Sequence, residues 1–377
     1  MKKMQSPISY FSSLKDYRHE GYITHSLVNI VAISIAAIIC GASDWYEVED
    51  YGKEKKSWLQ TFLNIGDKVP SHDTYNRFFS FIDPIALEQC FADWIAAIAN
   101  LTEGRIISID GKTLRGSKGS GKEHFIHMVS AWCNANGLVL GQQKVDEKSN
   151  EITAIPALLE LLVIKGCIVT IDAMGCQQSI AAKIVEREAD YILAVKDNQK
   201  FLHQDIREAF DNEKPVDEYT ASNVAHGRIE TRTTSVITNT DWVCKSENWE
   251  HLHSIIKVVA TREDKKTNVK ETATRYYISS KKETAVFFQN AIRSHWSIEN
   301  RLHWMLDVAF NEDSSKKQAI NSAQNFSLLN KIALNMINHH KLDDDRGAKK
   351  ISVKRKRKMA AWNNDYLLGI LLSFEPH

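Results

Sequence analysis

Two short runs of β-branched residues, each ending in an aspartate, constrain the fold of this chain more than any other feature. They read Arg105-Ile-Ile-Ser-Ile-Asp110 and Cys167-Ile-Val-Thr-Ile-Asp172. Such runs predict buried strands, and ligands of open α/β sheets bind where strands end. An aspartate in that position is desolvated on one side and needs a cation or hydrogen-bond donors. Asp110-Gly111 alone is also typical of a turn, but two such ends favour a shared metal site.

The segment around these runs, about 104–198, alternates strand and helix patterns. Strands are predicted over 124–133 and 138–145, on either side of an Asn-Gly pair that is a hairpin signal. Helices are predicted over 151–162 and 177–188, with a last strand over 191–195. We therefore expect an antiparallel meander of three strands, followed by crossovers to a fourth and a fifth.

The flanking regions have other patterns. Residues 1–103 read as helical, and residues 199–283, rich in Thr, Val and charge, predict a β-rich insertion. Residues 284–340 read as helical again, and 341–377 as a basic C-terminal segment. The most apolar stretch, 27–42, is 16 residues long. A membrane span needs about 20 apolar residues, so we expect a buried core helix and no membrane partner.

Composition is that of an ordinary globular protein of the cytoplasm. The chain has 48 Lys and Arg against 47 Asp and Glu, a net charge of +1. That balance argues against a uniformly basic nucleic-acid binder but leaves room for local basic patches. None of the six cysteines forms a C-x-x-C pair. We expect reduced, mostly buried thiols rather than a zinc ribbon or a disulfide framework.

A short polar helix is predicted after Pro70. Ser71 is placed as its N-cap, and His72, Asp73, Asn76 and Arg77 follow. This pattern is typical of the recognition helix of a helix-turn-helix motif. It is equally typical of a polar surface helix, and the residues do not separate the two.

A polar stripe is predicted on the helix that begins near 293. His295, Glu299, His303 and Asp307 recur every four residues, which keeps them close to one face of a helix. A solvated polar face would show the same spacing, although two nearby tryptophans, Trp296 and Trp304, make full solvation less favourable. The stripe supplies a third carboxylate for the two strand ends.

Several motifs in order make this chain resemble the bacterial DDE insertion-sequence transposases, closest to the H-repeat-associated branch. They are Ile-Ser-Ile-Asp110-Gly-Lys-Thr-Leu-Arg-Gly, Lys148-Ser-Asn-Glu-Ile, Ile-Asp172-Ala-Met, His295-Trp-Ser-Ile-Glu299-Asn-Arg-Leu-His-Trp-Met-Leu-Asp-Val and Pro70-Ser-His-Asp-Thr-Tyr-Asn-Arg. The resemblance covers nearly the whole chain. It implies an α/β fold: an RNase H-like catalytic core, with a mixed five-stranded sheet and helices, interrupted by the β-rich insertion and preceded by a helical N-terminal DNA-binding domain.

The resemblance also implies the chemistry. Asp110, Asp172 and Glu299 would be the catalytic and metal-binding triad, with two Mg²⁺ ions or Mn²⁺ in their place. The implied activity is cleavage and strand transfer of DNA at the terminal inverted repeats of an insertion sequence. Two ends must be paired on target DNA, so we expect a homodimer in the complex, near the bacterial nucleoid. A stand-alone nuclease and an inactive DNA-binding remnant remain alternatives.

One departure from related transposases surrounds the third acid. Many of them follow the pattern Tyr-x2-Arg-x3-Glu-x6-Lys, whereas the flanking positions here are Ile292, His295 and Leu306. His295 could hydrogen-bond phosphate in place of the arginine. The departure leaves open whether hairpin chemistry on flanking DNA carries over.

Candidate DNA contacts come from three further places. Lys196 and Asn198 follow the last core strand, where a polar turn is equally typical. Alternation puts Arg228, Glu230 and Arg232 on one face of a strand, which suits either a salt-bridged edge or a phosphate contact. Residues 341–360 hold nine basic and three acidic side chains, which favours phosphate binding over a solvated tail. In the insertion, Trp242 and Trp249 are predicted to pack in the core rather than stack on an extruded base. The full set of predicted contacts is Lys112, Arg115, Lys196, Asn198, Arg228, Arg232, Arg293, His295, Arg301, His303, Lys354, Arg355, Lys356 and Arg357.

Overall fold

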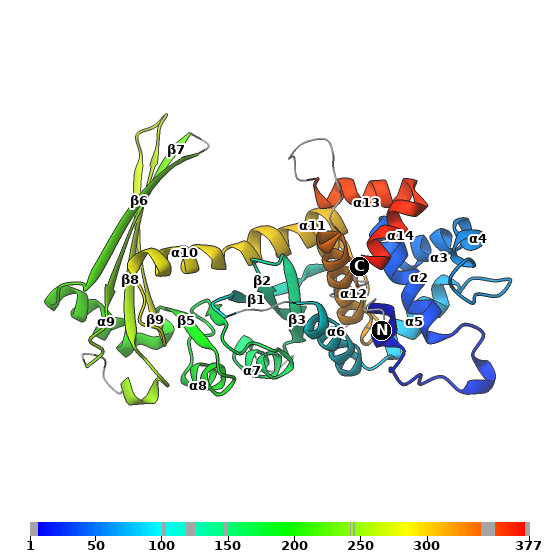
Figure 1. Cartoon of the computed structure of the whole chain (residues 1–377), viewed down its shortest axis with the longest axis horizontal. Helices are drawn as coiled ribbons and strands as arrows, with labels where there is room; N and C mark the ends of the chain where they lie inside the picture. The colour runs from blue at the N-terminus through cyan, green and yellow to red at the C-terminus, as the bar shows by residue number, and fades with distance from the viewer. Residues whose placement is uncertain are drawn as a thin grey trace. The chain divides into compact units, whose positions relative to one another are not determined.

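The computed structural model divides the chain into two compact units (Figure 1). Unit 1 comprises Met1–Asn100, Gly111–Lys148 and Glu299–His377, and unit 2 comprises Leu101–Asp110 and Ser149–Ile298. The structure describes residues 7–99, 103–117, 125–146, 150–225, 227–241, 243, 246–340 and 351–373. The predicted features at Lys148, Trp242, Cys244, Lys349 and Lys350 lie outside the described residues.

Helix α2, Leu27–Cys40, lies at the centre of unit 1. The Ser26 hydroxyl accepts the N–H of Asn29 at the start of the helix, and Gly41, at φ 126°, ends it. Its residues are apolar on nearly all sides and buried, as an all-round hydrophobic helix must be. The predicted core helix is therefore confirmed. Among the described residues no single helix is long and apolar enough to span a membrane; only α2 with α3, Trp45–Glu54, passes that test, as a pair bent by 96°.

Helix α12, Ser322–His339, packs against α2 and is buried although it carries polar side chains. The Asn335 amide bonds both the N–H and the carbonyl of Val139, each at 2.8 Å, and the Asn325 amide donates to the Phe79 carbonyl at 2.9 Å. Val139 lies on β3, Leu138–Lys144, which pairs antiparallel with β2, Ile126–Cys133. The predicted hairpin is confirmed, with Gly137 in its turn at φ 67°.

The remaining helices of unit 1 surround this core. Helix α5 begins where predicted, because the Ser71 side chain accepts the N–H of Thr74. The part of the basic run from Lys354 to Lys358 lies on a helix, α13, which packs against α2. The further bounds are α1 Pro7–Phe11, α4 Lys56–Leu59, α5 His72–Phe81, α6 Pro84–Ile98, α11 Trp304–Phe310, α13 Val353–Trp362 and α14 Asn364–Leu372.

Unit 2 is built on a sheet that changes from parallel to antiparallel. Strands β1, β4 and β5 are parallel neighbours, and β5 then pairs antiparallel with β9, followed by β8, β7 and β6. The bounds are β1 Ile106–Leu114, β4 Ile168–Ile171, β5 Asp190–Val195, β6 Asp217–Ala225, β7 Arg228–Ile237, β8 Ser254–Asp264 and β9 Lys270–Ser279. Strand β1 begins in unit 2 and continues into unit 1 past Asp110.

The predicted five-stranded sheet is wrong, because the sheet has nine strands in the order β3-β2-β1-β4-β5-β9-β8-β7-β6. The strands of the β-rich insertion continue the core sheet through β5 and β9, where Leu193 pairs with Ile278. Both residues are fully buried. The pairing of β9 with β5 covers the edge that β5 would otherwise expose. The insertion therefore extends the core sheet and does not form a separate one.

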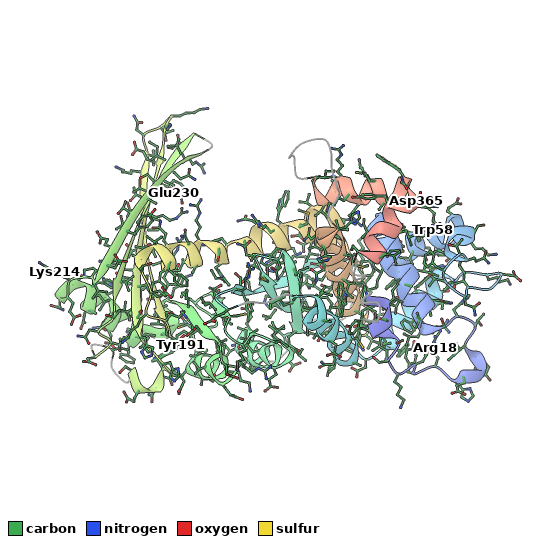
Figure 2. The ribbon with its side chains drawn as sticks, in the orientation of Figure 1. Arg18, Trp58, Tyr191, Lys214, Glu230 and Asp365 are labelled. Atoms are coloured by element: carbon green, nitrogen blue, oxygen red, sulfur yellow. The ribbon has the colours of Figure 1, made fainter. Side chains whose placement is uncertain are left out.

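Four helices accompany the sheet of unit 2: α7 Glu151–Leu161, α8 Gln178–Glu186, α9 Lys200–Asn212 and α10 Ala285–His295. Helix α10 packs on β4, β6 and β7, and its Phe288, Ala291 and Ile292 join one buried cluster with Ile168, Ile192 and Tyr277. Core strands and insertion strands therefore share a hydrophobic layer. Strands β6–β9 form a long ribbon that projects beyond α10, and Glu230 lies on the projecting part (Figures 1 and 2). Trp249 is buried, in agreement with its predicted packing.

Candidate active site

The two aspartates of unit 2 belong to neighbouring parallel strands, Asp110 inside β1 and Asp172 directly after β4. Ile109 of β1 is paired in register with Ile171 of β4, so Asp110 and Asp172 each come one residue beyond a paired position. Parallel strands carry paired residues at the same level and on the same face of the sheet. Both aspartates are only partly exposed. The register therefore brings the two acids to the same level of adjacent strands. The prediction that a strand ends at Asp110 is wrong, because β1 runs on to Leu114.

Asp172 is held by the backbone of the turn that follows it. Its Oδ1 accepts the N–H of Met174 at 3.1 Å and of Gly175 at 3.4 Å. The turn is tight, since a Cβ on Gly175 would lie 2.3 Å from the Ile171 side chain. Burial and the charge of Glu151 raise the pKa of Asp172, against the opposing effect of these N–H groups and of Lys196. Its carboxylate is thus oriented yet short of positive charge, which suits a cation ligand.

Lys196 and Asn198 follow strand β5 beside this turn. Both residues are exposed, and the Lys196 charge is close enough to lower the pKa of Asp172. The Asn198 amide donates to the Ala173 carbonyl at 2.6 Å, which ties the end of β5 to the residue after Asp172. Both residues follow the last core strand as predicted, and their DNA contact stays a prediction.

Helix α10 is fixed to β4 just before Asp172. The Thr170 hydroxyl lies 2.9 Å from Nδ1 of His295, and it also donates to the Ser108 hydroxyl at 3.2 Å. His295 therefore contacts a core strand through Nδ1, and its predicted phosphate contact stays a prediction. Thr170 was not predicted as a site residue, although its place two residues before Asp172 in an otherwise apolar strand marks it.

In unit 1, Glu299 is paired with His303 on one π-helical segment, Ile298–His303. His303 Nδ1 lies 3.1 Å from Glu299 Oε2, and the side chains are 5% and 59% exposed. Burial lowers the pKa of His303, although Glu299 acts in the opposite direction. The predicted polar stripe is therefore interrupted by a π turn, and its third member points into the protein rather than toward solvent.

A buried ion cluster in unit 1 surrounds Lys112. The Lys112 ammonium contacts Asp307, and it lies 2.9 Å from Glu312 and 3.5 Å from Asp313, while its side chain is only 12% exposed. Burial raises the pKa of Glu312, but the ammonium groups of Lys331 and Lys112 outweigh that effect and hold the pKa below its usual value. Internal carboxylates contact the ammonium of Lys112, and its predicted DNA contact stays a prediction.

The backbone beside this cluster is also closely packed. A Cβ on Gly116 would lie 2.1 Å from the carbonyl oxygen of Ser315, so only glycine fits the end of the Asp-Gly-Lys-Thr-Leu-Arg-Gly motif. Arg115, by contrast, has a side chain that is 79% exposed, with Asp313 at 3.5 Å. In this motif Gly116 is therefore required by close packing, whereas its neighbour Arg115 contributes charge at the surface.

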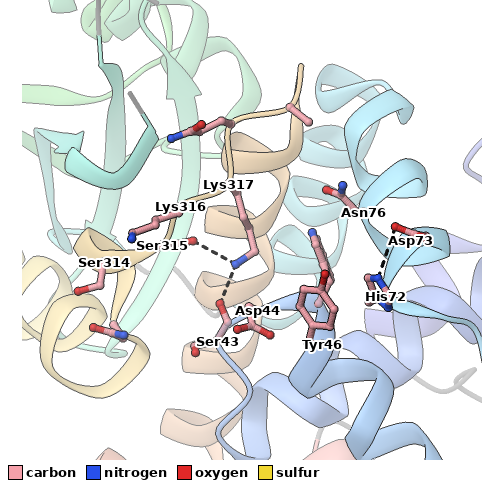
Figure 3. Close-up of a pocket in the computed structure, with 14 residues that line it drawn as sticks. Ser43, Asp44, Tyr46, His72, Asp73, Asn76, Ser314, Ser315, Lys316 and Lys317 are labelled. Carbon is pink, nitrogen blue, oxygen red and sulfur yellow. Dashed lines mark hydrogen bonds and ion pairs between the residues drawn. The ribbon is translucent and has the colours of Figure 1, made fainter. Parts of the chain in front are cut away.

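The polar face of α5 lines a pocket of about 490 Å³ in unit 1 (Figure 3). His72 stacks on Tyr46 with ring centroids 4.1 Å apart, and its Nδ1 lies 2.7 Å from Glu49. Across the pocket, Lys317 donates to the Ser43 carbonyl at 2.6 Å and to the Ser315 hydroxyl at 3.1 Å. Burial lowers the pKa of Lys317 to about 8. Both interpretations of α5, recognition helix and polar surface helix, stay predictions.

The predicted DNA contacts fall into two groups. The interior group includes Lys356, which donates to the carbonyls of Ile337 and His340, and the buried Arg357, which donates to the Ile38 carbonyl at 2.6 Å. Lys112 and His303 also make internal contacts, as does Nδ1 of His295, and the DNA contacts predicted for these five residues stay predictions. The residues with exposed or half-exposed side chains are Arg115, Lys196, Asn198, Arg228, Arg232, Arg293, Arg301, Lys354 and Arg355.

Comparison with known proteins gives a consistent result. Residues 101–336 match the family model described as "Transposase DDE domain", and residues 8–95 match the one described as "DDE_Tnp_1-associated". The "Putative transposase YncI" of Escherichia coli O157:H7 is 44% identical, over 98% of this chain and 95% of its own. The "H repeat-associated putative transposase YhhI" of Escherichia coli K12 is 38% identical over 98% of both chains. The "Inactive transposase YbfQ" of Escherichia coli K12 is 30% identical over 21% of this chain.

Proposed function

Because this chain belongs to the transposase family with a DDE domain, we propose that it binds the terminal inverted repeats of an insertion sequence and catalyses metal-dependent DNA cleavage and strand transfer. The observation that carries the proposal is the register of β1 and β4, which sets Asp110 and Asp172 one residue beyond the paired Ile109 and Ile171. Two carboxylates on adjacent parallel strands form the oxygen-rich edge that such chemistry needs.

We assign Asp110, Asp172 and Glu299 as the metal ligands. All three offer carboxylate oxygens, the donors that Mg²⁺ prefers, and Mn²⁺ accepts the same donors. The raised pKa of Asp172 supports the assignment, since burial and a neighbouring glutamate leave this carboxylate in need of positive charge. When bound, a pair of divalent ions would supply an activated water or 3′-hydroxyl and stabilise the leaving oxygen.

The protein's own residues prepare these ligands. The N–H groups of Met174 and Gly175 orient the Asp172 carboxylate before any ion arrives. The contact between Thr170 and His295 fixes the end of α10 one helical turn before Glu299 in the sequence. Lys196, exposed beside Asp172, is placed to meet a DNA phosphate near the scissile bond.

DNA contacts away from the acids are proposed only for exposed or half-exposed polar side chains. Arg228 and Arg232 lie on β7, where Arg232 pairs with Glu230 at 2.6 Å, and Lys354 and Arg355 lie on the exposed side of α13. Arg115, Arg293, Arg301 and Asn198 complete the proposed set. Because two element ends must be joined to target DNA, we propose that a homodimer forms in the DNA complex.

A strand-transfer assay tests this proposal. The full chain is incubated with Mg²⁺, a labelled terminal-repeat duplex and target plasmid, and wild type is compared with Asp110→Asn, Asp172→Asn and Glu299→Gln. Because loss of a group that merely supports a metal ligand costs about 10–100-fold in activity, loss of a ligand itself should exceed about 100-fold. Asp211→Asn, an exposed acid on α9, is the matched control.

Each other outcome of the assay points elsewhere. If wild type cuts the duplex but never joins it to target, the stand-alone nuclease is the better function. If wild type binds the repeat but neither cuts nor joins, the chain is an inactive remnant. If the three variants join DNA as well as wild type, the assignment of the acids is wrong.

A further inference from the structure

His303 has a buried environment next to an exposed acid. Its side chain is 5% exposed, whereas Glu299, four residues earlier, is 59% exposed and lies 3.1 Å away through Oε2. Both sit on the π-helical segment Ile298–His303. Such segments are rare and occur often at functional sites, where they change the direction of side chains. The buried imidazole therefore meets the exposed carboxylate from the protein side.

The chemistry of the contact fixes the direction of the hydrogen bond. An ionised carboxylate can only accept, so the nitrogen that faces it must donate. The contacting nitrogen of His303 is Nδ1. A neutral imidazole carries one N–H, and that N–H then belongs on Nδ1. The contact with Glu299 therefore depends on the N–H at Nδ1 of His303.

We propose that His303 is a positioning residue that holds the Glu299 carboxylate ready for a divalent ion. This inference rests on the proposed function, because it takes Glu299 to be a metal ligand. An exposed glutamate samples several rotamers, and a hydrogen bond from a buried, immobile donor restricts it to those with Oε2 over His303. Partners that orient a metal ligand in this way typically contribute about 10–100-fold to metal affinity.

Two further contacts support a fixed position for His303. The adjoining Leu302 and Leu306 are fully buried, which anchors the segment on both sides of the histidine. One turn later Asp307 is bound by the Lys112 ammonium. The helix that carries Glu299 is thus held firmly on its inner side, and the Glu299 side chain itself depends on His303.

Asparagine and glutamine substitutions separate this role from others. The side-chain amide of asparagine places an N–H donor near the position of Nδ1, whereas that of glutamine reaches the position of Nε2. The full chain without DNA is titrated with Mn²⁺ by calorimetry. We expect His303→Gln to weaken Mn²⁺ binding about 10–100-fold and His303→Asn to stay within about threefold of wild type.

The matched control is another histidine–carboxylate pair. His203 Nδ1 lies 3.1 Å from Asp197, the same atom and distance as at His303, but the Asp197 side chain is 96% exposed and away from the proposed ligands in the chain. His203→Gln should leave Mn²⁺ affinity unchanged. Asp110→Asn should abolish binding, which shows that the titration reports the proposed metal site.

Distinct results overturn the proposal. If His303→Gln binds Mn²⁺ as wild type does, or if glutamine restores binding where asparagine fails, Nδ1 does not position Glu299. If wild type binds no Mn²⁺ and Asp110→Asn changes nothing, the metal site of the proposed function fails as well.

A measurement on the wild-type chain covers the case in which neither substitution folds. Nitrogen-15 NMR of labelled histidines distinguishes a protonated Nδ1 from a protonated Nε2. We expect the resonance that shifts in Glu299→Gln to belong to a ring protonated at Nδ1. A ring protonated at Nε2 alone would contradict the proposed hydrogen bond.

Discussion

The strand acids of unit 2 and the helical acid of unit 1 are held by different kinds of structure. Asp110 and Asp172 follow paired strand positions, and backbone N–H groups orient Asp172. Glu299 is 59% exposed and is oriented by a side chain, His303. Backbone-held acids depend on the sheet as a whole, whereas a side-chain-held acid can be loosened by one substitution. We therefore expect substitution of His303 to impair the proposed metal site without unfolding the protein.

The buried cluster at Lys112 is where we expect the largest effect on stability. Lys112→Met keeps the length of the side chain but leaves Glu312, 3% exposed, and Asp307 without their ammonium. Removing one partner of a buried ion pair typically costs about 3–5 kcal/mol. Denaturant unfolding should show that loss.

Arg115→Met serves as the control for Lys112→Met. Its side chain is 79% exposed, and a surface ion pair contributes about 0–1 kcal/mol. If the two variants lost equal free energy of unfolding, the Lys112 ion pairs would contribute no more than the surface pair of Arg115, and the distinction would be wrong.

A smaller effect on thermal stability, which depends on pH, should distinguish substitution of Asp172 from substitution of Glu299. Burial raises the pKa of Asp172, so the folded chain binds that proton more tightly than the unfolded chain does. The protonated Asp172 carboxyl group therefore favours the folded state. This contribution to the free energy of unfolding is fully present below the pKa of the unfolded chain. It is lost as the pH rises through the raised pKa of the folded chain. Asp172→Asn, which never ionises, should therefore raise the melting temperature of the metal-free protein at neutral pH.

The comparison with Glu299 makes that measurement specific. Glu299→Gln keeps an oxygen that accepts from His303, and its side chain is exposed, so we expect a change within about 0.5 kcal/mol. Thermal melts in a chelator, at several pH values from about 4 to 7, provide the test. If Asp172→Asn melted below wild type at neutral pH, the ionised Asp172 carboxylate would not destabilise the fold, and this explanation would be wrong.

Local patterns predicted much of the site. The runs before Asp110 and Asp172 are strands because β-branched residues suit a buried sheet, although β1 continues past Asp110 to Leu114. The Ser71 cap and the apolar helix Leu27–Cys40 were equally visible, since capping and burial act over a few residues. The family resemblance added Glu299, which spacing alone left among several polar residues.

Contacts between distant parts of the chain could not be predicted. The internal partners of Lys112, Asp307 and Glu312, lie 195 and 200 residues away in the sequence. The pairing of β5 with β9 likewise joins residues on either side of the insertion. In the basic run a signal was present, since Val353, Arg357 and Ala360 recur at helical spacing and are the buried residues of α13.

Cysteine substitution at the three acids tests the central assignment most directly. A thiolate is a poor ligand for Mg²⁺, which prefers oxygen, and a better one for softer Mn²⁺. DNA cleavage by Asp110→Cys, Asp172→Cys and Glu299→Cys is measured with each ion. If the three residues bind the metal, each variant is inactive in Mg²⁺ and regains part of its activity in Mn²⁺. Full activity in Mg²⁺ at any of the three positions, or no recovery in Mn²⁺, would contradict its place in the metal site.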